Sequence, residues 1–153
     1  GYYMLPMNIS KLITLDDIEK QRCFNIQWLK EKGIPQTFKN NKLTAKGFIS
    51  KILNRVTPTN ASWNGHNSSG WKKDIENVNG FDERMQYGGQ DRELGERLFN
   101  FGLKSKQLRY SAVCVHLDHK RGYKTPESIA KNVGIRNTTK KEKSVWTFYG
   151  ITK

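Results

Sequence analysis

A single carboxylate, Asp91, directly follows two glycines and an amide in the run Gly88-Gly89-Gln90-Asp91. Glycine adopts backbone angles that other residues avoid, and it lets the backbone come close to a neighbour. The apolar spacing after this run predicts a helix over 91–101. A carboxylate at the start of a helix can accept backbone N–H bonds, and it could act as a general base toward a sugar hydroxyl. A helix N-cap is the simpler alternative.

A second group of polar side chains follows the predicted strand over 108–117, "LRYSAVCVHL". Alternation along a strand puts His116 and Asp118 on one face, with His119 in the loop beyond. A histidine at a strand end with carboxylates nearby could bind a divalent metal, although the spacing does not predict zinc. A lone, partly buried imidazole with a structural role is the alternative.

Two tryptophans, Trp63 and Trp71, lie in and beside a loop rich in Asn, Ser and Gly over 60–70. An aromatic ring can stack on a sugar ring while the amides bond its hydroxyls, so the loop could contact carbohydrate. The same rings could instead anchor two hydrophobic corners of the fold.

The composition predicts an anionic partner. Lys plus Arg outnumber Asp plus Glu by 27 to 14, giving a formal net charge of +13, which favours nucleic acid, nucleotide phosphates or an anionic membrane surface. No nucleic-acid-binding motif is present, and the stretch 82–97 is acidic, so specific nucleic-acid binding is not expected. Two distant cysteines predict free thiols, and no apolar run is long enough to span a membrane. The expected location is cytoplasmic.

The expected fold class is α+β, with a few partly antiparallel strands and two or three helices on one side. A strand is expected near the start of the chain, a helix from about Asp16 to the stop at Gly33, and a short helix in the tail. Residues 74–90 are expected to be irregular. The helix over 45–56 has an apolar stripe opposed by lysines, which predicts either packing on the core or contact with an anionic membrane.

The order of motifs resembles the C-terminal half of family 2 glycosyltransferases of the GT-A fold, which transfer sugars from nucleotide-diphospho-sugars. The similarity is greatest to the branch shared with galactosyltransferases and chondroitin-type polymerases. The motifs are the Gly-x-Asn loop of "GHN", "NGFDE", "GGQD" and "HLDH", and the strong match covers about 60–121. We therefore expect 1–153 to be a single-domain fragment. Its parts are a variable middle (2–59) with two helices, the motif region (60–121) and a basic loop and tail (122–153).

The resemblance implies a role for several residues. Asp91 would deprotonate the acceptor hydroxyl, and His116 would be one ligand of a Mn²⁺ or Mg²⁺ that bridges the donor's diphosphate. Substrate would be contacted by Gly65, Asn67, Trp71, Gly88, Gly89 and Gln90. A basic loop that could close over phosphates contains Lys120, Arg121 and Lys124.

Two residues depart from the family pattern. Gln90 stands where a glutamate is common, so the donor or acceptor could differ. The usual tryptophan between the glycines is missing, and Tyr87 lies one step earlier.

The family's Asp-x-Asp metal-binding motif is absent from the chain. We therefore expect the remaining metal ligands to come from a missing N-terminal half, and the isolated fragment to be inactive. The implied partners are a nucleotide-sugar donor and a glycan or lipid-linked acceptor, with peripheral contact to the inner face of an anionic membrane and self-association of the fragment. The alternatives are a basic nucleic-acid-binding module and a non-catalytic carbohydrate-binding domain.

Overall fold

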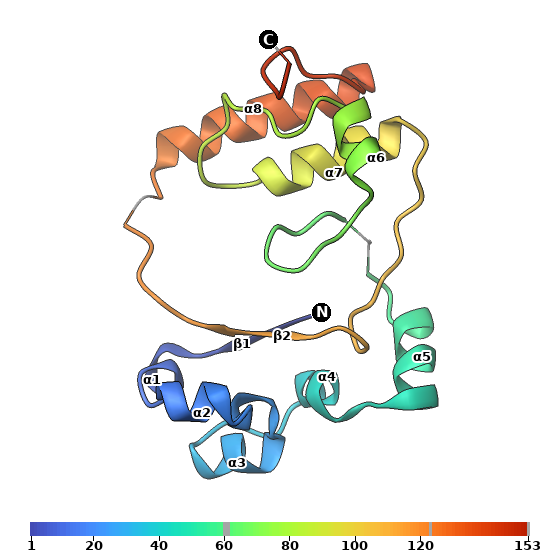
Figure 1. Ribbon diagram of the computed structural model, residues 1–153. Coiled ribbons are helices and arrows are strands. Elements are labelled where there is room, and N and C mark those ends of the chain that lie inside the picture. Colours follow the sequence, from blue (N-terminus) through green and yellow to red (C-terminus); the bar gives the residue numbers. More distant parts are fainter. Residues whose placement is uncertain (60–61, 123, 153) are drawn as a thin grey trace. The chain divides into compact units, whose positions relative to one another are not determined.

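The computed structural model describes residues 1–59, 62–122 and 124–152, and it has the expected α+β character (Figure 1). The start of the expected loop at 60–61, and residue 123 of the basic loop, lie outside the described residues. The elements in chain order are β1 (Tyr2–Leu5), α1 (Met7–Ser10), α2 (Leu15–Glu19), η1 (Arg22–Phe24), α3 (Ile26–Glu31), η2 (Phe38–Asn40), α4 (Asn41–Thr44), α5 (Gly47–Val56), α6 (Lys72–Asn77), α7 (Gln90–Asn100), β2 (Cys114–Leu117) and α8 (Pro126–Glu142).

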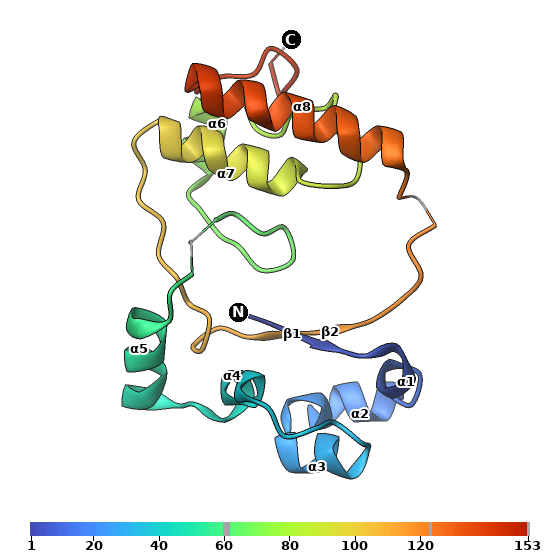
Figure 2. The same cartoon turned by 180° about the vertical axis from the view of Figure 1, so that it is seen from behind.

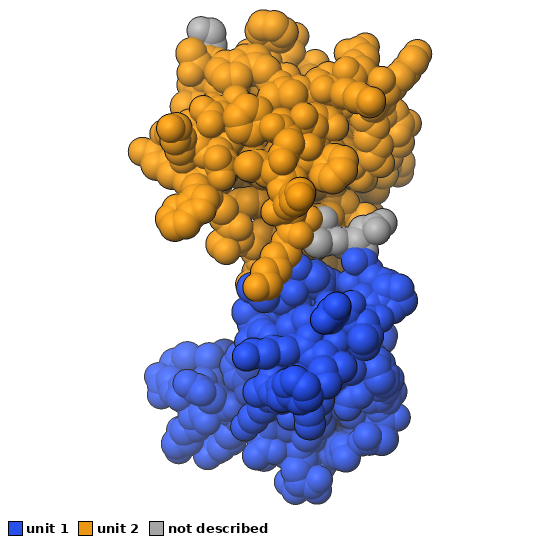
Figure 3. Space-filling model, turned by 90° about the vertical axis from the view of Figure 1, so that its right-hand side faces the viewer, with its two compact units in different colours: residues 1–59, 107–120 blue, residues 60–106, 121–153 orange. Residues whose placement is uncertain are grey.

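The described residues form two compact units, coloured separately in Figure 3. Unit 1 consists of residues 1–59 and 107–120. Unit 2 consists of the described parts of 60–106 and 121–153. The division of the chain into the segments 2–59, 60–121 and 122–153 stays a prediction.

The sheet of unit 1 has two strands. β1 and β2 pair in parallel, with Tyr2 opposite Cys114 and Leu5 opposite Leu117, so the expectation of partly antiparallel strands is wrong for the part of the chain that the structure describes. β2 is also shorter than the predicted strand, because the chain turns at 109–111. There the backbone N–H of Tyr110 donates to the side chain of Asn54 in α5 instead of to a neighbouring strand. The core beneath the sheet contains Tyr3, Leu5, Ile9, Leu29 and Ile34.

The helix expected from Asp16 to Gly33 is divided into three short pieces. Gln21 adopts a left-handed conformation (φ 56°), which interrupts the helix, and the side chain of Asn25 then accepts bonds from the backbone N–H groups of Gln27 and Trp28 to start α3. Local hydrogen bonds from a polar side chain compete with a continuous helix in this way. Cys23 lies in this segment as a buried free thiol, and Cys114 is also free.

Unit 2 is built on two helices, α7 and α8, which lie side by side in both views (Figures 1 and 2). The tail was expected to hold only a short helix, but α8 spans 17 residues, with Thr125 as its N-cap and Pro126 in its first turn. The side chains that α8 buries are polar: Ser128, Asn132 and Thr139. The helix therefore lacks the apolar period by which a helix is recognised. Similarly, α6 occupies part of a connection that was expected to be irregular.

The interior of unit 2 contains a buried ion pair. Arg97 and Glu93 of α7 are each 1% exposed, and Nε of Arg97 donates to Oε1 of Glu93 at 2.8 Å. The guanidinium also donates to the backbone carbonyls of Val78 and Gly80. Thr139 of α8 donates to Glu93 at 2.9 Å. One ion pair thus links α7, α8 and the segment that leads into the "NGFDE" motif.

The "NGFDE" motif holds the end of the chain. Asn79 is left-handed (φ 64°), and its side-chain amide donates to the carbonyls of Thr147 (2.7 Å) and Thr152 (2.9 Å). The hydroxyl of Thr147 donates to Asp82 at 2.9 Å. A Cβ on Gly150 would overlap the carbonyl oxygen of Asn79, so only glycine fits there. The motif therefore has a structural role in this chain.

We expect Arg97→Met to lower the free energy of unfolding by about 3–5 kcal/mol, because Glu93 would remain buried without its counter-charge. The measurement is urea denaturation. Arg92→Met is the matched control on an exposed position of the same helix, and we expect it to change stability by less than about 0.5 kcal/mol. Equal effects of the two substitutions would contradict the structural importance of the buried pair.

Acid should destabilise unit 2 through Asp82. Burial raises the pKa of this carboxyl. Hydrogen bonds from Arg84 and Thr147 lower the pKa, and together they outweigh burial, so the pKa lies below the ordinary value of 3.8. The unfolded chain then binds the proton more readily, and stability present above pH 3.8 is lost as the pH falls through the lowered pKa. We expect urea midpoints measured from about pH 5 to about pH 2 to fall less steeply in Asp82→Asn than in the unchanged protein. Parallel slopes would show that Asp82 does not contribute.

Candidate functional site

Two left-handed glycines shape the entry to α7. Gly88 (φ +113°) and Gly89 (φ +94°) both have angles that strain other residues, and Gly89 is the N-cap. The side-chain oxygen of Gln90 accepts a bond from the N–H of Gly88 at 2.9 Å and closes the turn. The predicted helix over 91–101 is confirmed as Gln90–Asn100, with Gly102 (φ +96°) just beyond its end.

Asp91 lies in the first turn of α7 and is not its N-cap, so the simpler alternative for this residue is wrong. Its Oδ2 accepts the backbone N–H of Gly65 at 2.9 Å, and its Oδ1 accepts the N–H of Arg92 at 2.8 Å. The carboxylate is half-buried. Two motifs that lie 26 residues apart in the sequence, the Gly-x-Asn loop and the Gly-Gly-Gln-Asp turn, are thereby joined at one side chain.

Gly95 allows the loop before Gly65 to lie against α7. A Cβ at Gly95 would come within 2.8 Å of the Cβ of Trp63 and 2.9 Å of its backbone nitrogen. Trp63 also packs on the core formed by Val78, Leu94 and Leu98. One turn of α7 therefore separates the Trp63 contact from the Asp91–Gly65 bond. The sequence contained a signal for this position, a glycine inside a strongly predicted helix, which usually marks close packing.

A cavity of about 1000 Å³ lies within unit 2 beside α7. Its aromatic lining comes from Trp63, Trp71 and Phe99, and Trp71 is 81% exposed. Its charged lining includes Arg92, Lys104 and Lys143, together with Glu96, whose carboxylate pairs with Arg136 and Lys140. Aromatic faces next to hydrogen-bonding groups are suited to a sugar ring, and the excess of cations favours an anionic ligand.

The other residues predicted to contact substrate have separate positions. Asn67 is exposed, and its N–H donates to the carbonyl of Asn64 at 3.0 Å. Trp71 is the N-cap residue of α6. The space beside Gly88 and Gly89 is bordered by side chains of α8. A Cβ added to Gly88 would lie 3.5 Å from Cγ1 of Ile129, and a Cβ added to Gly89 would lie 3.1 Å from Cδ of Arg136. The left-handed φ of both residues is thus a sufficient reason for these glycines without a bound sugar.

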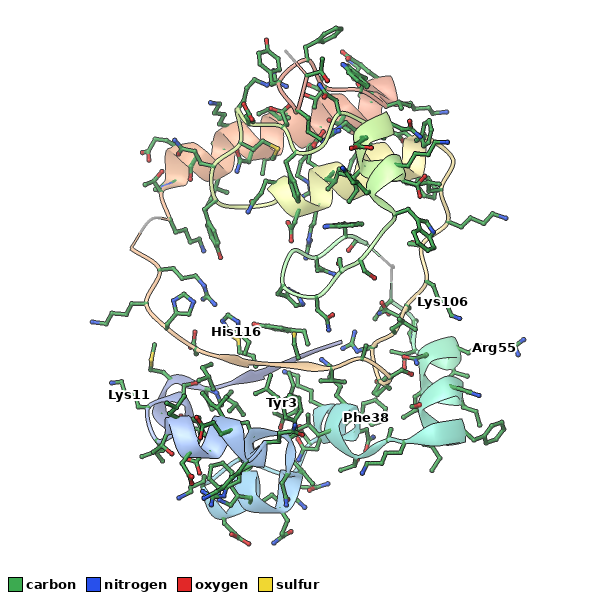
Figure 4. The ribbon with its side chains drawn as sticks, in the orientation of Figure 1. Tyr3, Lys11, Phe38, Arg55, Lys106 and His116 are labelled. Atoms are coloured by element: carbon green, nitrogen blue, oxygen red, sulfur yellow. The ribbon has the colours of Figure 1, made fainter. Side chains whose placement is uncertain are left out.

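His116 lies in β2 of unit 1, opposite Met4 (Figure 4). Its ring centroid is 5.5 Å from those of Tyr2 and His119. Within residues 1–59, 62–122 and 124–152, no group of three or more His, Cys, Asp and Glu side chains is placed to hold a metal ion. The residues present therefore do not form a metal site by themselves, and His116 as a ligand stays a prediction.

The predicted phosphate loop follows β2. Lys120 and Lys124 are exposed, Arg121 is half-buried, and the N–H of Lys124 donates to the carbonyl of Arg121 at 3.3 Å.

None of the described helices has the length and apolar character needed to cross a bilayer.

We expect Gly95→Ala to destabilise unit 2 by about 1–3 kcal/mol, because the added methyl would push the Trp63 segment away from α7. Gly134→Ala is the matched control, since it is also inside a helix but a Cβ there would meet nothing within 4 Å. That change should stabilise the protein by about 0.5–1 kcal/mol through helix propensity alone. Urea denaturation of both variants checks the pair, and stabilisation by Gly95→Ala would contradict the close approach.

Comparison with known proteins supports a sugar-transfer role. Residues 55–120 match a protein-family model described as the N-terminal domain of galactosyltransferase. No curated protein and no solved structure matches the chain. The matched range includes Gly65, Gly88–Asp91 and His116. The description names an N-terminal domain, so membership of family 2 and a C-terminal placement stay predictions. The match of residues 55–120 thus supports a galactosyltransferase-like glycosyltransferase region in this part of the chain.

Proposed function

We propose that this chain forms part of an inverting glycosyltransferase in which Asp91 is the general base. The observation that carries the proposal is the hydrogen bond between Asp91 and the N–H of Gly65, which joins two motifs of the galactosyltransferase-like region at one carboxylate. The start of a helix is a favourable place for a negative charge. Each carboxylate oxygen has a second lone pair, so Asp91 can accept a proton without losing its backbone bonds.

The proposed reaction is a single displacement. An acceptor hydroxyl oxygen attacks the anomeric carbon of the donor, the new C–O bond forms as the bond to the nucleoside diphosphate breaks, and the hydroxyl proton passes to Asp91. Attack on the face opposite the leaving group inverts the anomeric configuration. A base fixed by two backbone bonds needs little rearrangement in the transition state, which is the property expected of a preorganised site.

The cavity beside α7 supports a glycan acceptor. Trp63 contacts α7 one turn after Asp91. A sugar stacked on Trp63 or Trp71 in the cavity would contact Arg92, which follows Asp91, and would have to extend beyond the cavity lining to reach the base. Asn67 and Gln90 would add hydrogen bonds to sugar hydroxyls. A non-catalytic carbohydrate-binding domain would use the same tryptophans, but it would not need Asp91.

The donor side of the reaction stays a set of predictions. Lys120, Arg121 and Lys124 would contact the diphosphate, and a Mn²⁺ or Mg²⁺ that includes His116 among its ligands would neutralise the leaving group. The described residues do not complete a site for this metal. The acceptor would be a glycan or a lipid-linked glycan at the cytoplasmic side of a membrane. The isolated chain would also self-associate through the edge of its sheet.

We expect Asp91→Asn to lower kcat by about 10²–10⁴-fold with little change in KM, because the amide keeps the size of the side chain but cannot accept the proton. The assay is transfer of labelled sugar from a panel of nucleotide sugars to glycan acceptors, using the complete protein encoded by the reading frame.

Glu76→Gln is the matched control for this experiment. It makes the same chemical change at an exposed carboxylate of α6 that pairs with exposed Lys72. Full turnover in Asp91→Asn would exclude Asp91 as the base. Glycan binding by both variants, with no transfer by the unchanged protein, would instead favour the carbohydrate-binding alternative.

A further inference from the structure

The amphipathic helix α5 has its apolar side in solvent. Phe48, Ile49, Ile52 and Val56 are 76%, 62%, 42% and 63% exposed. Each residue turns a helix by about 100°, so these four side chains fall within one half of its circumference. The helix itself is confirmed, but packing of its apolar stripe on the core, one of the two expectations for it, is wrong.

The polar side of α5 is the side that binds unit 1. Ser50 is 6% exposed, and its hydroxyl accepts a bond from Ser111 at 3.4 Å. Asn54 donates to the hydroxyl of Ser111 at 2.6 Å and accepts the N–H of Tyr110 at 2.8 Å. The orientation of α5 is therefore fixed by specific hydrogen bonds, and these bonds keep the apolar side turned outward.

The charges around α5 have one sign. Lys46, Lys51 and Arg55 are all exposed, and Arg55 extends from the helix in Figure 4. On the helix circumference, Lys51 and Arg55 are next to Phe48, at one edge of the apolar face. No Asp or Glu occurs anywhere between Glu31 and Asp74. An exposed apolar face with cations along its border is complementary to a surface of anionic headgroups over hydrocarbon.

We infer that α5 is a membrane-docking helix, which lies in the interface of an anionic membrane with Phe48, Ile52 and Val56 inserted among the lipids. Lys51 and Arg55 contact the headgroup phosphates. A second copy of the chain fits this face less well, because the cations that border it would be brought together and residues 32–73 contain no carboxylate to compensate them.

The test is co-sedimentation of the protein with vesicles of phosphatidylcholine alone and of phosphatidylcholine mixed with phosphatidylglycerol. We expect binding only to the anionic vesicles, and weaker binding as salt is raised. The double substitution Phe48→Ser and Ile52→Ser should weaken this binding at least tenfold. Lys51→Gln with Arg55→Gln should weaken it as well and should remove most of its salt dependence.

Leu12→Ser with Leu15→Ser is the matched control, because it removes two exposed apolar side chains of unit 1 that lie outside α5. This variant should bind like the unchanged protein. Circular dichroism checks the fold of every variant. If the Phe48→Ser and Ile52→Ser variant does not fold, the Lys51→Gln and Arg55→Gln variant still decides the test. Equal binding to both kinds of vesicle, or no loss in both α5 variants, overturns the inference. The inference is also overturned if the unchanged protein binds no vesicles and forms a dimer that the Phe48→Ser and Ile52→Ser substitutions dissociate.

The outcome is independent of the proposed catalytic role. Asp91 lies in unit 2 and α5 in unit 1, so Asp91→Asn should bind anionic vesicles normally even if it abolishes transfer. Loss of vesicle binding in the α5 variants with normal transfer to a water-soluble acceptor would support membrane docking by itself.

Discussion

Unit 2 depends on the hydrogen bonds and the ion pair that the buried guanidinium of Arg97 makes. The guanidinium neutralises Glu93, binds the carbonyls of Val78 and Gly80, and through Glu93 it is linked to Thr139 of α8. These bonds fix α7 between α8 and the turn that begins the "NGFDE" motif. A buried charge without such partners would be strongly destabilising, so the elements around Arg97 must form together.

The candidate site takes its geometry from this scaffold. Once α7 is fixed, Gly88 and Gly89 bring the chain into its first turn, and Gly95 lets the Trp63 segment lie against its side. The N–H of Gly65 then reaches the carboxylate of Asp91. The residues that could do chemistry are thus positioned by glycines and by polar contacts more than by a large apolar core.

The sequence was sufficient for the parts of the fold that have a period or a motif. The apolar spacing predicted α7, and the motif order brought Gly65 and Asp91 into one hypothesis. It was insufficient for α8, because that helix buries Ser128, Asn132 and Thr139 and has no apolar stripe. For α5 the period was right, but it left open whether the apolar side packs on the core or faces outward, because the side that faces unit 1 is chosen by hydrogen bonds of Ser50 and Asn54. Such long-range bonds leave no local pattern in the sequence.

The proposed reaction is a single displacement assisted by Asp91, and the anomeric configuration of the product distinguishes it from a double displacement. The complete encoded protein would be supplied with a nucleotide sugar of known configuration and a glycan acceptor, and the new linkage would be read by proton NMR. A single displacement should give a product whose configuration is inverted relative to the donor. A product that retains the donor's configuration would contradict it, because retention cannot arise from one attack by a deprotonated hydroxyl on the face opposite the leaving group.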